Sequence, residues 1–379
     1  MTSIPTRLAR AQQYATRAAF FLPGFATAAW APLVPFAKLR TALDEGSLGL
    51  VLLCLGAGSL LAMPIAGMLA ARHGCRAVMI ATLVMVIASL PLLAIAPSPS
   101  TLGLALFVFG AGVGACDCVM NMQAIMVERD SGRPMMSGFH AFYSIGGAVG
   151  AGAMTALLAL HLSPWLVCLL ASAVIAALLA ISLPHWRTDK APSDAPLFAV
   201  PHGVVLAIGV LCFVAFLAEG AVLDWSAVFL HEVQQVDPSR AGLGYLAFAI
   251  AMTVTRLVGD GVVARLGRHR SILIGSLIAA TGFALATFAS WLPFALCGYA
   301  LVGLGCANIV PALFSMAGNQ KVMPESLAIP AITTLGYAGV LAGPALIGFV
   351  AQASSLVFAF SAVAVTLVCI GLAARWVRA

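Results

Sequence analysis

Charged side chains are scarce in this sequence. Asp, Glu, Lys and Arg make up 8% of its 379 residues, whereas soluble domains carry about 25%. Hydrophobic residues account for 62%, and the mean hydropathy is +1.06. A water-soluble globular fold is excluded because its core could not cover so much apolar surface. The chain is therefore expected to be an integral membrane protein.

Several motifs that would indicate other functions are also absent. There is no Gly-x-x-x-x-Gly-Lys-[Ser/Thr] loop, so no ATP site is expected. No Ser/His/Asp constellation or metal-ligand motif lies at a water-exposed position, so we predict no enzyme activity, no cofactor and no metal. The nine cysteines lie almost all in apolar stretches, which argues against a disulfide framework. The net charge of +6 must be read by location and is no sign of nucleic-acid binding.

Long apolar runs are abundant instead. About 20 apolar residues cross the ~30 Å hydrocarbon layer as a helix. The runs are continuous rather than alternating, which favours helices over a β-barrel. We predict an all-α protein with twelve spans, at 18–38, 47–70, 77–96, 101–127, 137–160, 164–183, 203–229, 241–264, 271–289, 291–318, 328–350 and 354–374.

Positive charge predicts the orientation of the chain. With the N-terminus inside, 15 of the 19 Lys and Arg residues fall on the inner side, as expected for cytoplasmic loops. Both termini are then cytoplasmic. The first apolar segment is long and lacks a small-residue cleavage site, so we interpret it as a span and not as a signal peptide.

The two halves of the sequence resemble each other. The polar, Pro-rich segment 184–202 is the predicted linker between bundles of six spans at 1–183 and 203–379. One constant, ungapped offset aligns spans 2, 4 and 5 with spans 8, 10 and 11. Such a repeat predicts an axis along the membrane normal and a binding site near mid-membrane between the halves. The aligned pairs are Gly49 and Gly242, Arg72 and Arg265, Gly74 and Gly267, Gly110 and Gly303, Gly112 and Gly305, Gly146 and Gly339, and Gly150 and Gly343.

This topology, with GMLAARHGCR at 67–76, resembles the major facilitator superfamily. Its loop motif between spans 2 and 3 is matched by Arg72 and Gly74, although Ala71 stands where an acid is usual. The copy in the second half keeps Arg265 and Gly267. The resemblance implies a transporter of a small-molecule substrate that works by alternating access, functions as a monomer and lies in a bacterial inner membrane.

A narrower resemblance lies in spans 4 and 7. GACDCVMNMQ at 114–123 and AEGAVLDWSAVFL at 218–230 are similar to the fucose-permease-like and YbjJ-like branch of the superfamily. In that branch the acid of span 4 is linked to protonation and substrate, and Asp117 and Asn121 occupy those positions. The resemblance implies transport of a polar, sugar-like solute together with protons.

Carboxyl groups within spans are the strongest functional signal. A charge at mid-bilayer costs roughly 2.5–3.5 kcal/mol on insertion scales, so such a group must pair, face a cavity or take up a proton. Asp117 and Asn121 share one helix face with Gly110 and Gly114. We predict Asp117 as the main proton-coupling residue; a hydrogen-bonded pin between helices is the structural alternative. Glu219 is the second candidate.

The remaining polar residues within spans have open roles. Asp224 is a substrate ligand, a solvated group or a helix cap, and Trp225 is a gate residue or an interfacial anchor. Arg256 and Asp260 are expected to form a pair within one helix, while a substrate-binding Arg256 is the alternative. We expect no pair between Arg256 and Glu219 because the two lie at different depths. His140 is a candidate proton relay, and the other candidate substrate ligands are Tyr143, Asn308 and Trp30.

These residues predict a proton-coupled secondary transporter of a small polar solute. The main alternative is a proton-driven exporter of cationic or amphiphilic compounds, which the acids and the aromatic residues of span 1 would suit. A membrane protein that transports nothing, or a channel, is less compatible with the unpaired acids and the two-fold repeat.

Overall fold

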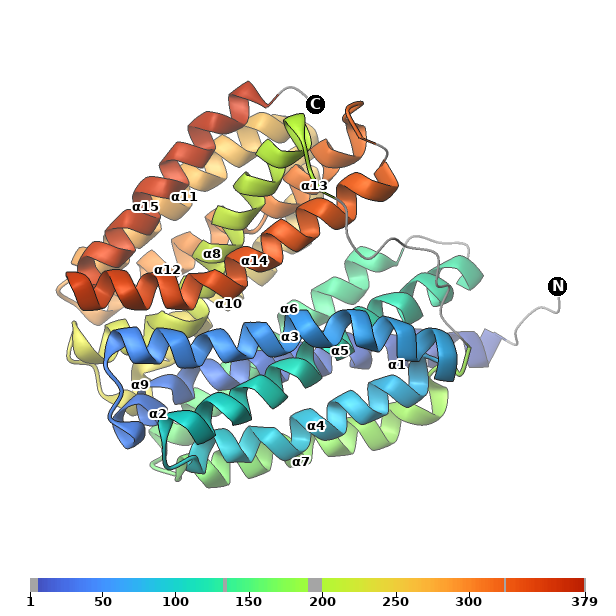
Figure 1. Cartoon of the computed structure of the whole chain (residues 1–379), viewed down its shortest axis with the longest axis horizontal. Helices are drawn as coiled ribbons and strands as arrows, with labels where there is room; N and C mark the ends of the chain where they lie inside the picture. The colour runs from blue at the N-terminus through green and yellow to red at the C-terminus, as the bar shows by residue number, and fades with distance from the viewer. Residues whose placement is uncertain (1–5, 132–134, 190–199, 324, 378–379) are drawn as a thin grey trace. The chain divides into compact units, whose positions relative to one another are not determined.

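The computed structural model describes residues 6–131, 135–189, 200–323 and 325–377, and these residues form helices joined by short connections (Figure 1). Within these ranges, twelve helical segments are long and apolar enough to cross a membrane. The predicted all-α membrane architecture is confirmed. The chain divides into two compact units, Met1–Thr41 with Cys54–Asp194 and Ala42–Leu53 with Ala195–Ala379. The last of these breakpoints, between Asp194 and Ala195, falls within the predicted linker 184–202, whereas residues 42–53 of the predicted first bundle are grouped with unit 2.

Unit 1 is built from the helices of the first half. In α5, the glycine-rich stretch continues straight into Asp117 without a break. The elements are α1 (Thr6–Trp30), η1 (Ala31–Leu33), α2 (Val34–Thr41), α3 (Glu45–His73, from Cys54 on), α4 (Cys75–Ile95), α5 (Pro99–Ser131), α6 (Met136–Ala159), α7 (Pro164–Ser182) and η2 (Leu183–His185).

Unit 2 is built from the helices of the second half, together with residues 42–53. Span 10, expected as one helix, is here two. The elements are α8 (Gly203–Glu232), α9 (Pro238–Ala241), α10 (Leu243–Leu266), α11 (Arg268–Phe288), α12 (Leu292–Cys306), α13 (Ile309–Asn319), α14 (Glu325–Ala353), α15 (Leu356–Ala373) and η3 (Ala374–Trp376).

The internal repeat is visible in the helix contacts of each unit. Both α4 and α11 begin after a glycine with positive φ, Gly74 at 87° and Gly267 at 78°. Glycine also allows close helix approach within each unit. A Cβ added at Gly110, Gly112, Gly303 or Gly305 would collide with the carbonyl oxygen of Leu55, Thr82, Phe248 or Gly275, respectively. Both partners of each contact in unit 1 therefore recur in unit 2 at the offset that relates the two halves of the sequence.

The C-terminal end of α4 is capped by one arginine. Arg40 Nε donates to the carbonyl of Ala96 at 2.8 Å. Its Nη1 and Nη2 donate to the carbonyls of Ala94 and Leu93, both at 2.7 Å. The last carbonyls of a helix have no partner within the helix, so this guanidinium satisfies three of them and places a positive charge at the negative end of the helix dipole.

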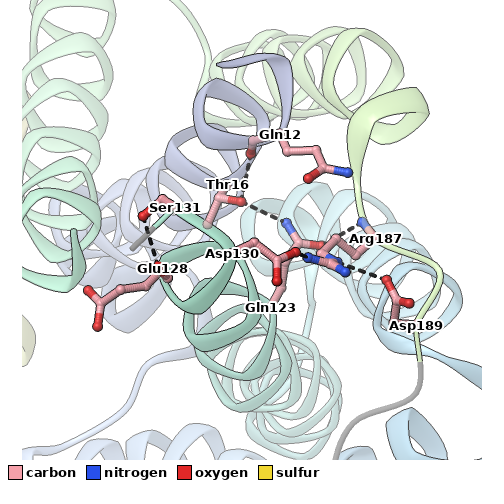
Figure 2. Close-up of polar contacts among 8 residues, drawn as sticks. All are labelled: Gln12, Thr16, Gln123, Glu128, Asp130, Ser131, Arg187 and Asp189. Carbon is pink, nitrogen blue, oxygen red and sulfur yellow. Dashed lines mark hydrogen bonds and ion pairs between the residues drawn. The ribbon is translucent and has the colours of Figure 1, made fainter. Parts of the chain in front are cut away.

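The segment after η2 is fastened to unit 1 by polar contacts. Figure 2 shows Arg187 between Asp130 of α5 and Asp189, and it forms ion pairs with both. The Arg187 N–H donates to Gln123, whose amide in turn donates to Thr16 of α1 at 3.1 Å. Burial alone would lower the pKa of the Arg187 guanidinium, but hydrogen bonds and attraction from the two aspartates raise it above its ordinary value. We call residues 186–189 the strap.

Replacing Gly303 by Ala tests the glycine contacts of unit 2. A methyl group there collides with backbone of α10, which cannot move as a side chain can. We expect a loss of about 1–3 kcal/mol, measured as a lower midpoint of thermal unfolding in detergent. Gly261→Ala is the matched control, because no atom of the described residues lies within 4 Å of its added Cβ. Equal unfolding midpoints for the two variants would contradict this role of Gly303.

Candidate functional site

A helix break divides span 10 in unit 2. α12 ends at Cys306 and α13 begins at Ile309. Pro311 contributes to the break, because proline has no N–H to donate to the carbonyl of Ala307, four residues earlier, and its ring clashes with that carbonyl. The repeat places Cys118 at the equivalent position of unit 1, where α5 continues unbroken. The break is therefore a property of unit 2, and broken helices in transporters expose backbone groups at binding sites.

Asn308 lies at this break and rests on α10. A Cβ at Gly259 would collide with Asn308 Oδ1, so only glycine leaves room for the amide. Asn308 holds the N-cap position of α13, yet its side chain makes no capping hydrogen bond. The side-chain amide of Asn308 therefore makes no hydrogen bond to the N–H groups at the start of α13.

Glu219 and Arg256 contact each other next to this break. Arg256 Nη2 lies 3.7 Å from Glu219 Oε2, and the side chains are 34% and 17% exposed, respectively. Glu219 Oε1 is buried without a hydrogen-bond partner among the described residues. Cys306, at the end of α12, is close enough to interact electrostatically with both charges. We call Glu219, Arg256 and Asn308 the unit 2 polar cluster.

The expectation that Glu219 and Arg256 do not pair is wrong. α8 begins at Gly203, and α10 ends at Leu266. Glu219 lies further along its helix from Gly203 than Arg256 lies from Leu266. At a rise of about 1.5 Å per residue, the two backbones differ in height by roughly 9 Å when counted from these ends. Two long side chains that reach toward each other close this gap.

Asp224, Trp225 and Ser226 form a second buried polar stretch in α8. Asp224 is 6% exposed and Trp225 is 0% exposed, so Asp224 is not solvated and Trp225 is not an interfacial anchor. α8 runs unbroken to Glu232, so Asp224 caps no broken helix either. Trp225 Nε1 and Ser226 Oγ have no hydrogen-bond partner within the described ranges. These corrections move Asp224 from the surface to the interior of unit 2.

Asp117 and Asn121 share one face of α5 in unit 1, as predicted. Asn121 Nδ2 donates to the backbone carbonyl of Asp117 at 2.8 Å, and both side chains are half-buried. Further along this face, Ser59 Oγ of α3 donates to the carbonyl of Gly110 at 2.7 Å. The glycine stripe therefore brings α3 against α5, and Asp117 continues that stripe.

The other predicted ligands of unit 1 lie on α1 and α6. Trp30 is 0% exposed, and its Nε1, like Thr27 Oγ1 one turn earlier, has no hydrogen-bond partner in the described part of the chain. His140 is exposed, with its ring 5.0 Å from that of Phe20. Tyr143 is half-buried, and its carbonyl lies against Gly24.

The predicted gate residues lie at the ends of helices. Arg72 and Gly74 close α3 and precede α4, and Arg265 and Gly267 do the same for α10 and α11. The side chain of Asp260 lies outside the described residues, so the Arg256–Asp260 pair stays a prediction. Within the described ranges, no three His, Cys, Asp or Glu side chains gather as metal ligands.

Sequence reasoning missed several residues of these sites. Pro311 in the middle of a predicted span allows a break, but Pro23, Pro64 and Pro91 lie inside unbroken helices, so the sequence does not single it out. Gly259 gave no signal, because only the structure shows that Asn308 rests on it. Thr27 and Ser226 are single hydroxyls in apolar helices, and such residues usually bond to their own backbone.

Comparisons with known proteins point to one family. The sequence pattern of the Major Facilitator Superfamily matches residues 18–328. A protein of Yersinia pestis described as an uncharacterized MFS-type transporter is 53% identical over 366 residues, covering 96% of this chain and 95% of its own. Among solved structures, the nucleoside transporter NupG aligns with a TM-score of 0.74 at 14% identity, covering 97% of this chain and 98% of its own. The D-xylose-proton symporter aligns with a TM-score of 0.71 at 14% identity, covering 97% and 96%.

Arg256→Gln tests the pair in the unit 2 polar cluster. Removing the arginine leaves the Glu219 charge without this neighbour, which costs about 3–5 kcal/mol for fully buried pairs. Because Arg256 is 34% exposed, we expect a smaller loss of about 1–3 kcal/mol, measured by thermal or denaturant unfolding in detergent. The double variant Glu219→Gln/Arg256→Gln should regain much of this stability. A double variant no more stable than Arg256→Gln would show that the pair does not hold these helices.

Proposed function

This chain belongs to the major facilitator superfamily, a family of membrane transporters, and from this premise we propose that it is a proton-coupled secondary active transporter of a small polar solute. The two units would expose the solute site alternately to either side of the membrane. The fucose-permease-like and YbjJ-like resemblance supports a sugar-like solute. We further propose that it works as a monomer in a bacterial inner membrane and needs no cofactor.

The unit 2 polar cluster is the observation that carries this proposal. It combines a guanidinium, a carboxylate oxygen without a partner among the described residues and an amide that caps no helix. Hydroxyl groups of a solute can form hydrogen bonds with donors and acceptors of these kinds. The cluster also lies next to an interrupted helix, as binding sites of transporters do. The two similar structures are named as a nucleoside transporter and a D-xylose-proton symporter. Nucleosides and D-xylose are neutral molecules with several hydroxyl groups.

The same cluster argues against the alternative, an exporter of cations. An exporter of cations needs acidic side chains whose negative charge is not compensated by a nearby base. The sequence suggested Glu219 as one such side chain. Its contact with Arg256 offsets this charge, so the cluster as a whole is close to neutral. A neutral site does not attract a lipophilic cation, whereas it can hold a neutral polar solute through hydrogen bonds.

We assign the proton-coupling role to Asp117 in unit 1 and to Asp224 in unit 2, with His140 as a relay. Asp117 lies half-buried in an apolar helix. Asp224 is 6% exposed, and its carboxyl forms no hydrogen bond or ion pair within the described ranges. A charged carboxyl group inside an apolar span is costly, so such a group must pair, face a cavity or take up a proton. Each can therefore hold a proton while the site is occluded and release it to water when the site opens.

Transport currents test the proposed function directly. Purified protein in solid-supported membranes is exposed to a panel of neutral sugars, nucleosides and lipophilic cations under a pH gradient. We expect currents with a neutral polar solute, and we expect Asp117→Asn to abolish them while the protein stays folded. Asp237→Asn is the matched control, because this exposed residue caps α9 and Asn caps equally well. Currents only with cations would establish the exporter instead.

Two variants in α8 separate coupling from solute binding. We expect Asp224→Asn to permit exchange of solute across the membrane while abolishing accumulation against a gradient, because the proton site is lost. Glu219→Gln should instead weaken solute binding, raising KM about tenfold through loss of one charged hydrogen-bond acceptor. Radiotracer exchange and uptake in vesicles measure the two effects. Accumulation by Asp224→Asn at the wild-type level would exclude its coupling role.

A further inference from the structure

α1 and α8, the first spans of the two halves, pack against glycines of α6 and α14, respectively. These glycines follow the constant offset of the internal repeat, whereas the residues that they face follow an offset one residue shorter. The contacts of the added Cβ atoms are Gly146 with Phe21 and Gly150 with Phe25 in unit 1, and Gly339 with Phe213 and Gly343 with Leu217 in unit 2. Equivalent positions of α1 and α8 are therefore one residue closer in sequence than the repeat alone indicates.

At this packing register, Thr27 of α1 is the counterpart of Glu219 of α8. Glu219 belongs to the unit 2 polar cluster, and its Oε1 is buried without a hydrogen-bond partner among the described residues. Thr27 Oγ1 is likewise buried and has no hydrogen-bond partner in the described part of the chain. The two units therefore place an unsatisfied polar atom at equivalent positions.

The hydroxyl group of Thr27 differs from those of other threonines in the helices. A threonine hydroxyl in a helix commonly bonds to the carbonyl three or four residues earlier. Thr16 of the same helix donates to the carbonyl of Gln12 at 2.8 Å, and Thr253 of α10 donates to that of Ala249 at 2.7 Å. Thr27 makes no such bond, so its hydroxyl group is left for a partner outside its own helix.

Trp30 adds a second unsatisfied atom to the same face of α1. Residues three apart are neighbours on a helix surface, and a long side chain leans back over the turn before it. Trp30 is 0% exposed, and its Nε1 has no hydrogen-bond partner within the described ranges. Unsatisfied buried donors and acceptors are costly, so two of them on one face mark a binding position.

We propose that Thr27 and Trp30 bind one hydroxyl group of the transported solute and make the transporter specific for it. The solute O–H donates to Thr27 Oγ1, and its oxygen accepts the hydrogen of Trp30 Nε1. Both protein atoms are shielded from water in this structure, so they become accessible when the helices move during the transport cycle. The inference rests on the proposed function and adds a specificity-determining residue, Thr27, to it.

The surroundings of Thr27 favour a neutral group of the solute. At the constant offset of the repeat, the counterparts of Arg256 and Asn308 in unit 1 are Met63 and Ala115, which carry neither a charge nor an amide. Unit 1 thus offers a hydroxyl group and an indole N–H without a charge. This combination suits a hydroxyl group of the solute better than a carboxylate or an ammonium group.

The test uses the purified full-length protein in vesicles, with D-xylose, D-glucose and uridine and their monodeoxy analogues as probes. Thr27→Val removes the hydroxyl group, Thr27→Ser keeps it, and Trp30→Phe removes the indole N–H. Thr41→Val in α2 is the matched control, because the Thr41 hydroxyl is already bonded to the carbonyl of Ala37 at 2.7 Å. Uptake rates give kcat/KM for each probe.

We expect the wild-type protein to transport one parent solute with a kcat/KM about fivefold to tenfold above that of one of its monodeoxy analogues. Thr27→Val and Trp30→Phe should lower kcat/KM for the parent by a similar factor and leave that analogue unaffected. Thr27→Ser and the control should keep the wild-type preference. A merely structural role of Thr27 would lower kcat/KM equally for the parent and all its analogues.

Two outcomes would overturn the inference in different ways. Wild-type preference in Thr27→Val, or an equal loss for every analogue, would overturn the role of Thr27 and leave the proposed function in place. Absence of uptake of all three parent solutes by the wild-type protein would overturn the inference together with its premise that the solute is a neutral hydroxyl compound.

Discussion

The structure depends on one constraint: a polar group in hydrocarbon must find its partner within the protein. Helices satisfy their own backbone, and glycine at positions such as Gly110 and Gly303 lets those helices approach closely. Helix ends need partners from elsewhere, and Arg40 and the strap supply them in unit 1. The repeat reproduces the glycine contacts in unit 2.

Departures from this constraint mark the proposed sites. Pro311 interrupts a helix that the repeat would otherwise continue, and Glu219 and Trp225 carry buried atoms without a hydrogen-bond partner among the described residues. Natural proteins break local rules of this kind mainly where function requires it. The cluster around Glu219 and Arg256 is therefore interpreted as a place for a solute, and the charges of its two ionic members offset each other.

Much of the fold was predictable from the sequence, because apolar run length and the constant offset between the halves each report a simple physical requirement. The site was predictable only in part. Spacing along one helix placed Asp117 beside Asn121 correctly. Contacts between helices depend on tilt and side-chain reach, which the sequence does not show. For this reason the Glu219–Arg256 contact, the burial of Asp224 and the seat of Asn308 on Gly259 came from the structure alone.

Proton movement that accompanies solute is the central claim, and a pH dye trapped inside protein-containing vesicles measures it most directly. A gradient of the solute that gives currents is imposed inward, with no initial pH difference. The account predicts that the vesicle interior acidifies as solute enters, and that Asp117→Asn abolishes this change. Alkalinisation of the interior would contradict symport and establish exchange. Solute entry without any pH change would contradict proton coupling altogether.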